Sequence, residues 1–112
     1  MPAETYQLKK DILYIEPDLK DSSSDDVLVE DIKKQIIEKS TANLILNLSH
    51  CSLFLAVRVG ALISACHFTE FPYGKLYIIV NNRQAKQFIQ TLSFSNTTVI
   101  FNQETIMLEK IA

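Results

Sequence analysis

The chain has 112 residues, of which 47% are hydrophobic and 21% are charged. This length and composition suit one folded domain and differ from those of a disordered protein, so we expect a single domain over residues 1–112. The 11 Lys and Arg residues face 13 Asp and Glu residues, and a net charge of -2 provides no general positive field for nucleic acid.

No apolar run is long enough to span a membrane. The longest runs, residues 53–57 and 76–80, are much shorter than the roughly 20 residues that a bilayer requires. Residues 1–4 lack the positive flank and apolar centre of a signal peptide. We therefore expect a cytoplasmic protein without a membrane span, in which Cys51 and Cys66 are reduced thiols.

The N-terminal part predicts a pair of strands. Two β-prone runs, residues 6–8 and 12–15, flank the turn-like residues 9–11. Pro17 blocks continued pairing, and residues 18–26 form a polar connection rich in Asp and Ser. A hairpin followed by a loop is the expected arrangement.

The middle of the chain alternates between helical and strand patterns. Residues 25–39 carry apolar side chains at helical spacing, with acidic residues early and lysines late. Residues 44–48 form a nearly continuous apolar strand, which is typical of a parallel strand covered on both faces. A second helix is expected over about residues 56–68, and the turn at residues 71–74 ends it.

The same alternation continues to the C-terminus. Residues 76–80 predict a buried strand, and residues 97–101 predict a β-branched one. Between them, Asn81 and Asn82 can cap a helix whose apolar residues are Ala85, Phe88, Ile89 and Leu92. Asn102 can cap a final helix whose apolar face holds Met107, Leu108 and Ile111.

This order of elements predicts an α/β fold. Strands that alternate with helices require right-handed crossovers and a largely parallel sheet, with the first strand pair adding an antiparallel edge. We expect a small sandwich with a mixed, mostly parallel sheet of about five strands and about four helices.

The segment around the central strand resembles a known family. Asn47-Leu48-Ser49 ends the strand, Leu53-Phe54 follows, and Val59-Gly60-Ala61-Leu62 lies in the next helix. This order is similar, without a gap, to the core of the STAS domain, which is named for sulfate transporters and anti-sigma factor antagonists. A Gly inside a helix costs up to about 1 kcal/mol relative to Ala, and close helix packing explains it better than propensity. Residues 75–80 and 87–92 also resemble the family's next strand and helix.

The chain departs from the family at its regulatory motif. Leu55-Ala56-Val57-Arg58 stands where the family's anti-sigma factor antagonists have Asp-Ser-Ser-Gly, so Val57 takes the position of the phosphorylated serine. Valine cannot accept a phosphoryl group, and the sequence predicts no phosphorylation site. Ser49 and Ser52 lie nearby, but using either requires a shift in register that spoils the match at residues 59–62.

Protein contact is the expected role of this segment. Residues 53–57 form an apolar run that cannot all face the core, and an exposed apolar cluster often marks an interface. We predict that Leu55, Ala56, Val57 and Arg58 bind a partner, with the Arg58 guanidinium reaching carboxylates at the rim. An equally weighted interpretation places Leu53, Leu55 and Val57 in the core and Arg58 in solvent.

No catalytic or metal site is expected. His50-Cys51 and Cys66-His67 are adjacent pairs, and neighbouring residues diverge on a strand or a helix, so neither pair readily gives two ligands to one zinc ion. The only glycines are Gly60 and Gly74, so the chain has no Gly-rich phosphate loop. We predict a non-enzymatic protein without a cofactor.

The resemblance implies a regulatory module of bacterial signalling that binds a protein such as a kinase-type anti-sigma factor. The alternative is an accessory module of a transporter or a lipid-transport system, which would bind a transporter subunit or a small ligand. The same apolar patch could also pair two copies across a two-fold axis. Nucleic acid is not an expected partner.

Overall fold

The computed structural model describes residues 3–9, 12–17, 25–92 and 94–101. The described elements follow one another as β1 (Ala3–Lys9), β2 (Ile12–Pro17), α1 (Asp25–Lys39), β3 (Asn43–Asn47), α2 (Leu53–Glu70), β4 (Leu76–Val80), α3 (Arg83–Leu92) and β5 (Thr97–Phe101). The final helix expected after Asn102 lies outside the described residues.

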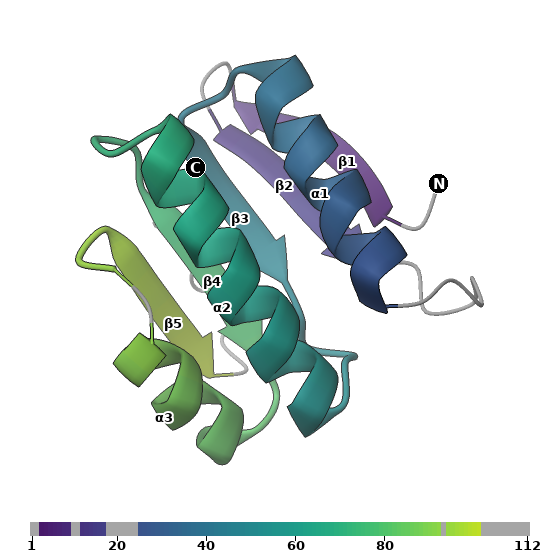
Figure 1. Ribbon diagram of the computed structural model, residues 1–112, viewed down its shortest axis with the longest axis vertical. Helices are drawn as coiled ribbons and strands as arrows, with labels where there is room; N and C mark the ends of the chain where they lie inside the picture. Colours follow the sequence, from purple (N-terminus) through teal and green to yellow (C-terminus); the bar gives the residue numbers. More distant parts are fainter. Residues whose placement is uncertain (1–2, 10–11, 18–24, 93, 102–112) are drawn as a thin grey trace.

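The sheet has the order β1-β2-β3-β4-β5, which is also the order of the strands along the chain. β1 pairs antiparallel with β2, and the other three pairings are parallel. Each of the three crossover connections therefore leads to the next strand on the same side of the sheet. Right-handed crossovers that all proceed in this direction place their helices on one face of the sheet. Figure 1 shows α1, α2 and α3 side by side over that face. The predicted α/β class with a largely parallel sheet is confirmed, and the described residues form three of the about four expected helices.

Local capping explains where the helices begin. α2 begins at Leu53, three residues before the expected position, because the Ser52 hydroxyl accepts a hydrogen bond from the Leu55 amide at 3.2 Å. α3 begins as expected, since Asn82 Oδ1 accepts from the amides of Gln84 and Ala85 at 2.8 and 3.2 Å. Its cap was predicted correctly because Asn is a common capping residue directly before an apolar periodic run.

The strands divide their side chains between two apolar layers. On the helix side, Leu44, Leu46 and Leu48 join the main core between the sheet and the three helices. On the opposite side, Ile45 packs with Ile12, Tyr14 and Ile79 in a second buried cluster. Both faces of this central strand are buried, which confirms the predicted reason for the nearly continuous apolar run of β3.

Gly60 sets the distance between α2 and α3. A Cβ atom at this position would lie 2.8 Å from Ile89 Cδ1 and 3.2 Å from Ile89 Cγ1. The fully buried Ile89 side chain of α3 thus occupies the space that any larger residue would need. Close packing of the helix, which the sequence predicted as the reason for this glycine, is confirmed.

A buried histidine joins the loops at the amino ends of the strands. His67 Nε2 donates to the Ala42 carbonyl oxygen at 2.7 Å, and Asn96 Nδ2 lies 3.3 Å from His67 Nδ1. The same Asn96 amide donates to the Gly74 carbonyl oxygen at 2.8 Å. A carbonyl oxygen can only accept, so Nε2 carries the proton that it donates to Ala42. The Asn96 amide nitrogen is a donor, so Nδ1 accepts and carries no proton, and the ring is neutral. Burial lowers the pKa of His67, and its bond to Ala42 opposes this only in part.

Acid is therefore expected to destabilise the fold through His67. A histidine with a lowered folded pKa binds its proton more readily in the unfolded chain, so stability is lost as pH falls below about 6.5. The loss can reach about 1.4 kcal/mol per pH unit for one proton. Urea denaturation at pH 7.5 and 5.5 would measure it. We expect His67→Gln to flatten this dependence and His50→Gln, at an exposed position, to preserve it. A flat wild-type profile would contradict the prediction.

Candidate functional site

An apolar groove lies between α2 and α3 on the outer surface of the helical layer. Its walls are formed by exposed side chains of both helices: Phe54, Leu62, Phe88 and Leu92. Phe54 is 76% exposed, and Phe88 and Leu92 are 55% and 58% exposed. The groove has a volume of about 750 Å³, which is room for several side chains of another molecule. We call this surface the α2–α3 groove.

The groove follows from how the two helices present their apolar residues. Phe88 and Leu92 are one turn apart on α3, while Phe54 and Leu62 are about two turns apart on α2. Gly60 and Ile89 hold the helices together beneath them. Two apolar stripes thus run side by side at the surface, and exposed apolar patches of this kind mark binding surfaces.

Among the described residues that line the groove, Arg58 is the one with a charged side chain. Its Nη2 atom lies 2.7 Å from Asp26 Oδ1 at the start of α1, and both side chains are substantially exposed. An exposed pair of this kind contributes only about 0 to 1 kcal/mol to stability. The guanidinium can therefore exchange Asp26 for a carboxylate of another molecule at low energetic cost.

The four residues predicted to bind a partner have different positions. Val57 and Arg58 line the α2–α3 groove. Ala56 is buried in the main core, and Leu55 is half-buried against it. As predicted, the apolar run of residues 53–57 does not all face the core. In this first turn of α2, Ala56 is buried and Phe54 is exposed. The structure thus brings two of the four to the groove, of which Val57 is also partly buried against the core, and packs the other two into or against the core.

The exposed groove residues Phe54, Leu62, Phe88 and Leu92 were not among the predicted site residues. A sequence signal existed on α3, where Ala85 and Ile89 already supply a buried stripe. Phe88 and Leu92 are excess apolar residues beside that stripe. Their surplus could have indicated an exposed apolar surface on this helix.

A polar network closes the carboxyl ends of β2 and β3. The buried Asn47 side chain donates from Nδ2 to Tyr14 Oη at 2.6 Å and to Glu16 Oε1 at 2.7 Å. Its Oδ1 atom accepts from the Ser49 amide at 3.0 Å and from the Ser49 hydroxyl at 2.6 Å. Both ends of the amide are engaged, so Asn47 stabilises the strand end and the loop that leads to α2.

These contacts also locate Ser49 and Ser52, the two serines that precede Val57. Ser49 donates its hydroxyl to Asn47, and Ser52 caps α2 through its own hydroxyl oxygen. Val57 lies in the second turn of α2, one residue before Arg58. Both serine hydroxyls thus have structural roles at the strand end and the helix start.

The cysteines and histidines lie apart from the groove walls. Cys51 and Cys66 are half-buried thiols without a disulfide, and burial raises the pKa of Cys66, with Lys33 opposing the shift. A protonated thiol is a weak nucleophile. Both nitrogens of His67 are engaged, so it is not available as a ligand beside Cys66. In the described part of the chain, no three His, Cys, Asp or Glu side chains group as a metal site.

The length and composition of α2 would also suit a membrane span, which is the case for no other helix of the described residues. Its mean hydropathy is 1.4 over 18 residues, and 33% of this stretch is buried inside the protein. The core helix of a soluble domain meets the same criteria. α2 buries Val59, Ile63 and His67 inside the protein, so length and composition alone do not assign it to a bilayer.

No protein-family model matches the sequence, and no curated protein sequence matches it either.

Proposed function

We propose that this protein is a non-catalytic, STAS-like regulatory module that binds another protein through the α2–α3 groove. The observation that carries the proposal is the exposure of four large apolar side chains, Phe54, Leu62, Phe88 and Leu92, along one groove. Their burial by a partner would be favourable by about 25 cal/mol per Å² of apolar surface. Aromatic residues in such a position often dominate binding energy.

The order of elements also supports the proposal. The strand pair followed by three helix and strand alternations is the order that the sequence predicted, and the segments that resemble STAS domains, residues 47–62, 75–80 and 87–92, lie within it. The groove lies on the helix that would carry the family's phosphorylated serine. Val57 replaces that serine, so we propose that binding here is constitutive or controlled by other means than phosphorylation at this position.

The chemistry of the groove describes the partner. Its surface should present apolar side chains flanked by a carboxylate that pairs with Arg58 in place of Asp26. A kinase-type anti-sigma factor in the cytoplasm is the partner that the resemblance implies first. A transporter subunit would instead assign the module to transport or lipid trafficking.

Partner capture with matched variants tests this proposal. Phe54→Ser together with Phe88→Ser removes two exposed aromatic rings, and we expect partner affinity to fall by about tenfold or more. Both side chains are more than half exposed, so the fold should be preserved. Arg58→Glu should weaken capture through charge repulsion with the same partner.

Tyr73→Ser is the control, because Tyr73 is 99% exposed and lies in the turn after α2, away from the groove. It should retain the partner at wild-type yield. Mass spectrometry of the captured protein would separate a signalling partner from a transporter subunit. Equal capture by the groove variant and the wild type, or capture of no partner, would contradict the proposed site. Light scattering would reveal whether the partner is a second copy.

A further inference from the structure

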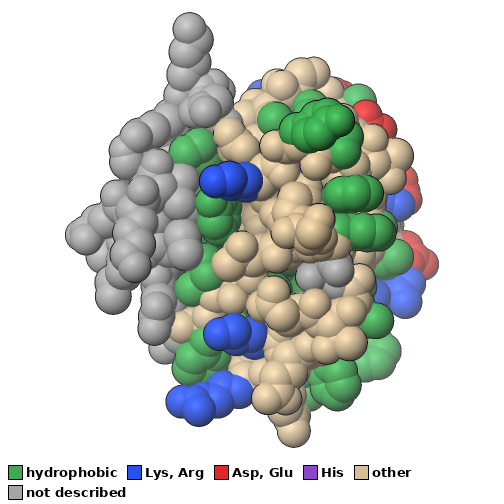
Figure 2. Space-filling view, turned by 90° about the vertical axis from the view of Figure 1, so that its left-hand side faces the viewer, with side chains coloured by type: hydrophobic (Ala, Val, Ile, Leu, Met, Phe, Trp, Pro, Cys, Tyr) green, Lys and Arg blue, Asp and Glu red, His purple; other side chains and the backbone are tan. Residues whose placement is uncertain are grey.

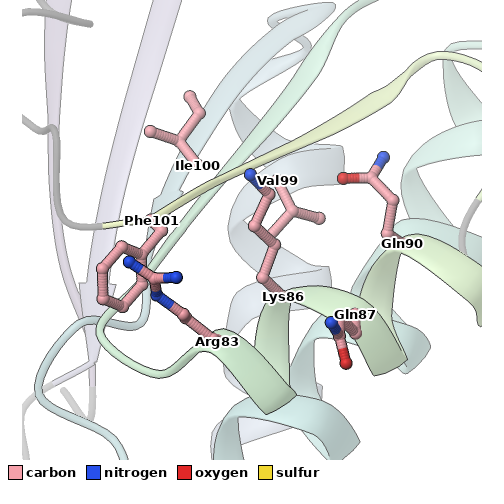
Figure 3. A pocket seen from close by; sticks show the side chains of 7 residues that line it. All are labelled: Arg83, Lys86, Gln87, Gln90, Val99, Ile100 and Phe101. Atoms are coloured by element: carbon pink, nitrogen blue, oxygen red, sulfur yellow. The ribbon is translucent and has the colours of Figure 1, made fainter.

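A cleft of about 500 Å³ lies on the other flank of α3, between this helix and the last strand of the described sheet. We call it the α3–β5 cleft. Figure 3 shows Arg83, Lys86 and Gln90 on the helix facing Val99 and Phe101 on β5. Lys86 is two residues before Phe88, and Gln90 is two residues before Leu92, so each lies about 200° around the helix from that groove residue. The cleft is therefore a surface distinct from the α2–α3 groove.

The cleft is positively charged. Arg83 and Lys86 both line it, and none of the ion pairs among the described residues involves either of them. No described Asp or Glu lines the cleft. Figure 2 shows this side of the molecule, with Lys and Arg side chains along it and the visible Asp and Glu side chains at its right margin. The charge of the site calls for an anionic ligand although the whole chain carries -2.

Arg83 is held in a defined position. Its guanidinium carbon lies 5.4 Å from the centroid of the Phe101 ring, a cation–π contact between α3 and the end of β5. This contact uses the face of the ring and leaves the guanidinium N–H donors available for a carboxylate. The cleft therefore combines an oriented donor group with a second cation one helical turn away.

The edge of β5 indicates the shape of the ligand. The Asn96 carbonyl oxygen accepts from the Leu76 amide at 3.1 Å, so parallel pairing turns the backbone of Thr98 and Ile100 toward β4. The alternate residues, Val99 and Phe101, direct N–H and C=O groups away from β4. No further described strand lies beyond β5. An edge of this kind is a template for an added extended segment.

The spacing of the helix residues fits the same geometry. Arg83, Lys86 and Gln90 recur at i, i+3 and i+7, which forms a row along α3 beside the strand. The rise from Arg83 to Lys86 is about 4.5 Å. Side chains two residues apart on an extended segment are about 6.6 Å apart, a difference that flexible Arg and Lys side chains can span.

We propose that the α3–β5 cleft is a second docking site, which binds an extended acidic segment of a partner chain. Carboxylates two residues apart in that segment pair with Arg83 and Lys86, and its backbone lies along the β5 edge. The proposal is independent of the α2–α3 groove and would remain if that groove had no partner.

A labelled peptide of alternating Glu and Val is the probe, and fluorescence anisotropy at low ionic strength measures its binding to the full chain. We expect it to bind at least about tenfold more tightly than a peptide with Gln in place of Glu. Arg83→Glu together with Lys86→Glu should remove that preference. Both residues are exposed, and an acidic residue in the first turn suits the helix dipole, so α3 should be preserved.

Lys39→Glu together with Lys75→Glu is the matched control, since it changes the net charge equally at exposed positions outside the cleft. This variant should keep the preference for the Glu peptide. Backbone NMR of the wild type should show peptide-dependent shifts at Val99 and Phe101. Equal binding of both peptides, an equal loss in the control, or no binding would overturn the proposal. Tighter binding of a single-stranded oligonucleotide would also overturn it.

Discussion

Gly74→Ala is expected to destabilise the protein by about 3 kcal/mol or more, because the added Cβ atom would meet rigid backbone. At this position a Cβ would lie 2.1 Å from the Ala42 carbonyl oxygen and 2.8 Å from the Ala42 carbonyl carbon. Real Cβ contacts do not reach such distances. The two loops must therefore separate for an alanine to fit.

The hydrogen bonds around Gly74 oppose that separation. Its amide donates to the Phe71 carbonyl oxygen at 2.9 Å, and its own carbonyl oxygen accepts from Asn96. The next residue is held as well, since the Lys75 amide donates to Asn43 Oδ1 at 3.0 Å. Moving this turn would also break the hydrogen bonds through which His67 and Asn96 join these loops, so separating the loops costs free energy.

Urea denaturation of Gly74→Ala and wild type would measure the loss. A loss of about 3 kcal/mol is a large fraction of the total stability of such a domain, which is about 5 to 15 kcal/mol. Tyr73→Ala, one residue earlier and 99% exposed, should change stability by no more than about 0.5 kcal/mol. A Gly74→Ala variant as stable as the Tyr73→Ala variant would show that the loops around Ala42 and Gly74 can move apart.

The sequence predicted the strands and helices best where turn residues bound a short periodic run. The bounds of α1, β4 and β5 were predicted to the residue, since Pro, Gly, Ser and Asn mark the neighbouring connections. The start of α2 was wrong by three residues. Its first turn contains apolar residues on all sides, and helical periodicity cannot be read where every position is apolar.

The candidate site was less predictable because it combines distant segments. Phe54 and Phe88 meet at one groove only once α2 and α3 pack through Gly60 and Ile89. Likewise, Arg83 meets Phe101 because a helix and a strand of the same crossover lie side by side. Spacing within one element predicts which residues share a face. It does not predict which face of a neighbouring element completes the surface.

Asn47 shows the same limit in the core. The sequence predicted it at the end of the central strand. Its partners Tyr14 and Glu16 lie on β2, more than 30 residues earlier, and the parallel pairing of Ile15 with Leu46 brings them together. This register explains why an amide is suitable here: Asn47 Nδ2 donates to a carboxylate that an aspartate would repel.

Asn47→Asp should therefore destabilise the protein by about 3 kcal/mol at neutral pH. The new carboxylate would lie about 2.7 Å from Glu16 Oε1, where Nδ2 now donates. Two like charges at that separation repel by about 6 kcal/mol at an effective dielectric constant near 20, so the folded pair would bind one proton instead. The unfolded chain holds no such proton at pH 7, and stability should recover as pH falls toward 5.

Urea denaturation at pH 7 and pH 5 would test this expectation. The variant is compared with the wild type at each pH, because acid destabilises the wild type through His67. The stability difference between the two proteins should shrink from pH 7 to pH 5. Asn82→Asp is the matched control, because Asn82 is an exposed helix cap that accepts hydrogen bonds through Oδ1, and a carboxylate there suits the helix start. It should remain close to wild-type stability at both pH values. If the stability difference between Asn47→Asp and the wild type were the same at pH 7 and pH 5, the loop at Ser49 would have to open and let the carboxylate reach water.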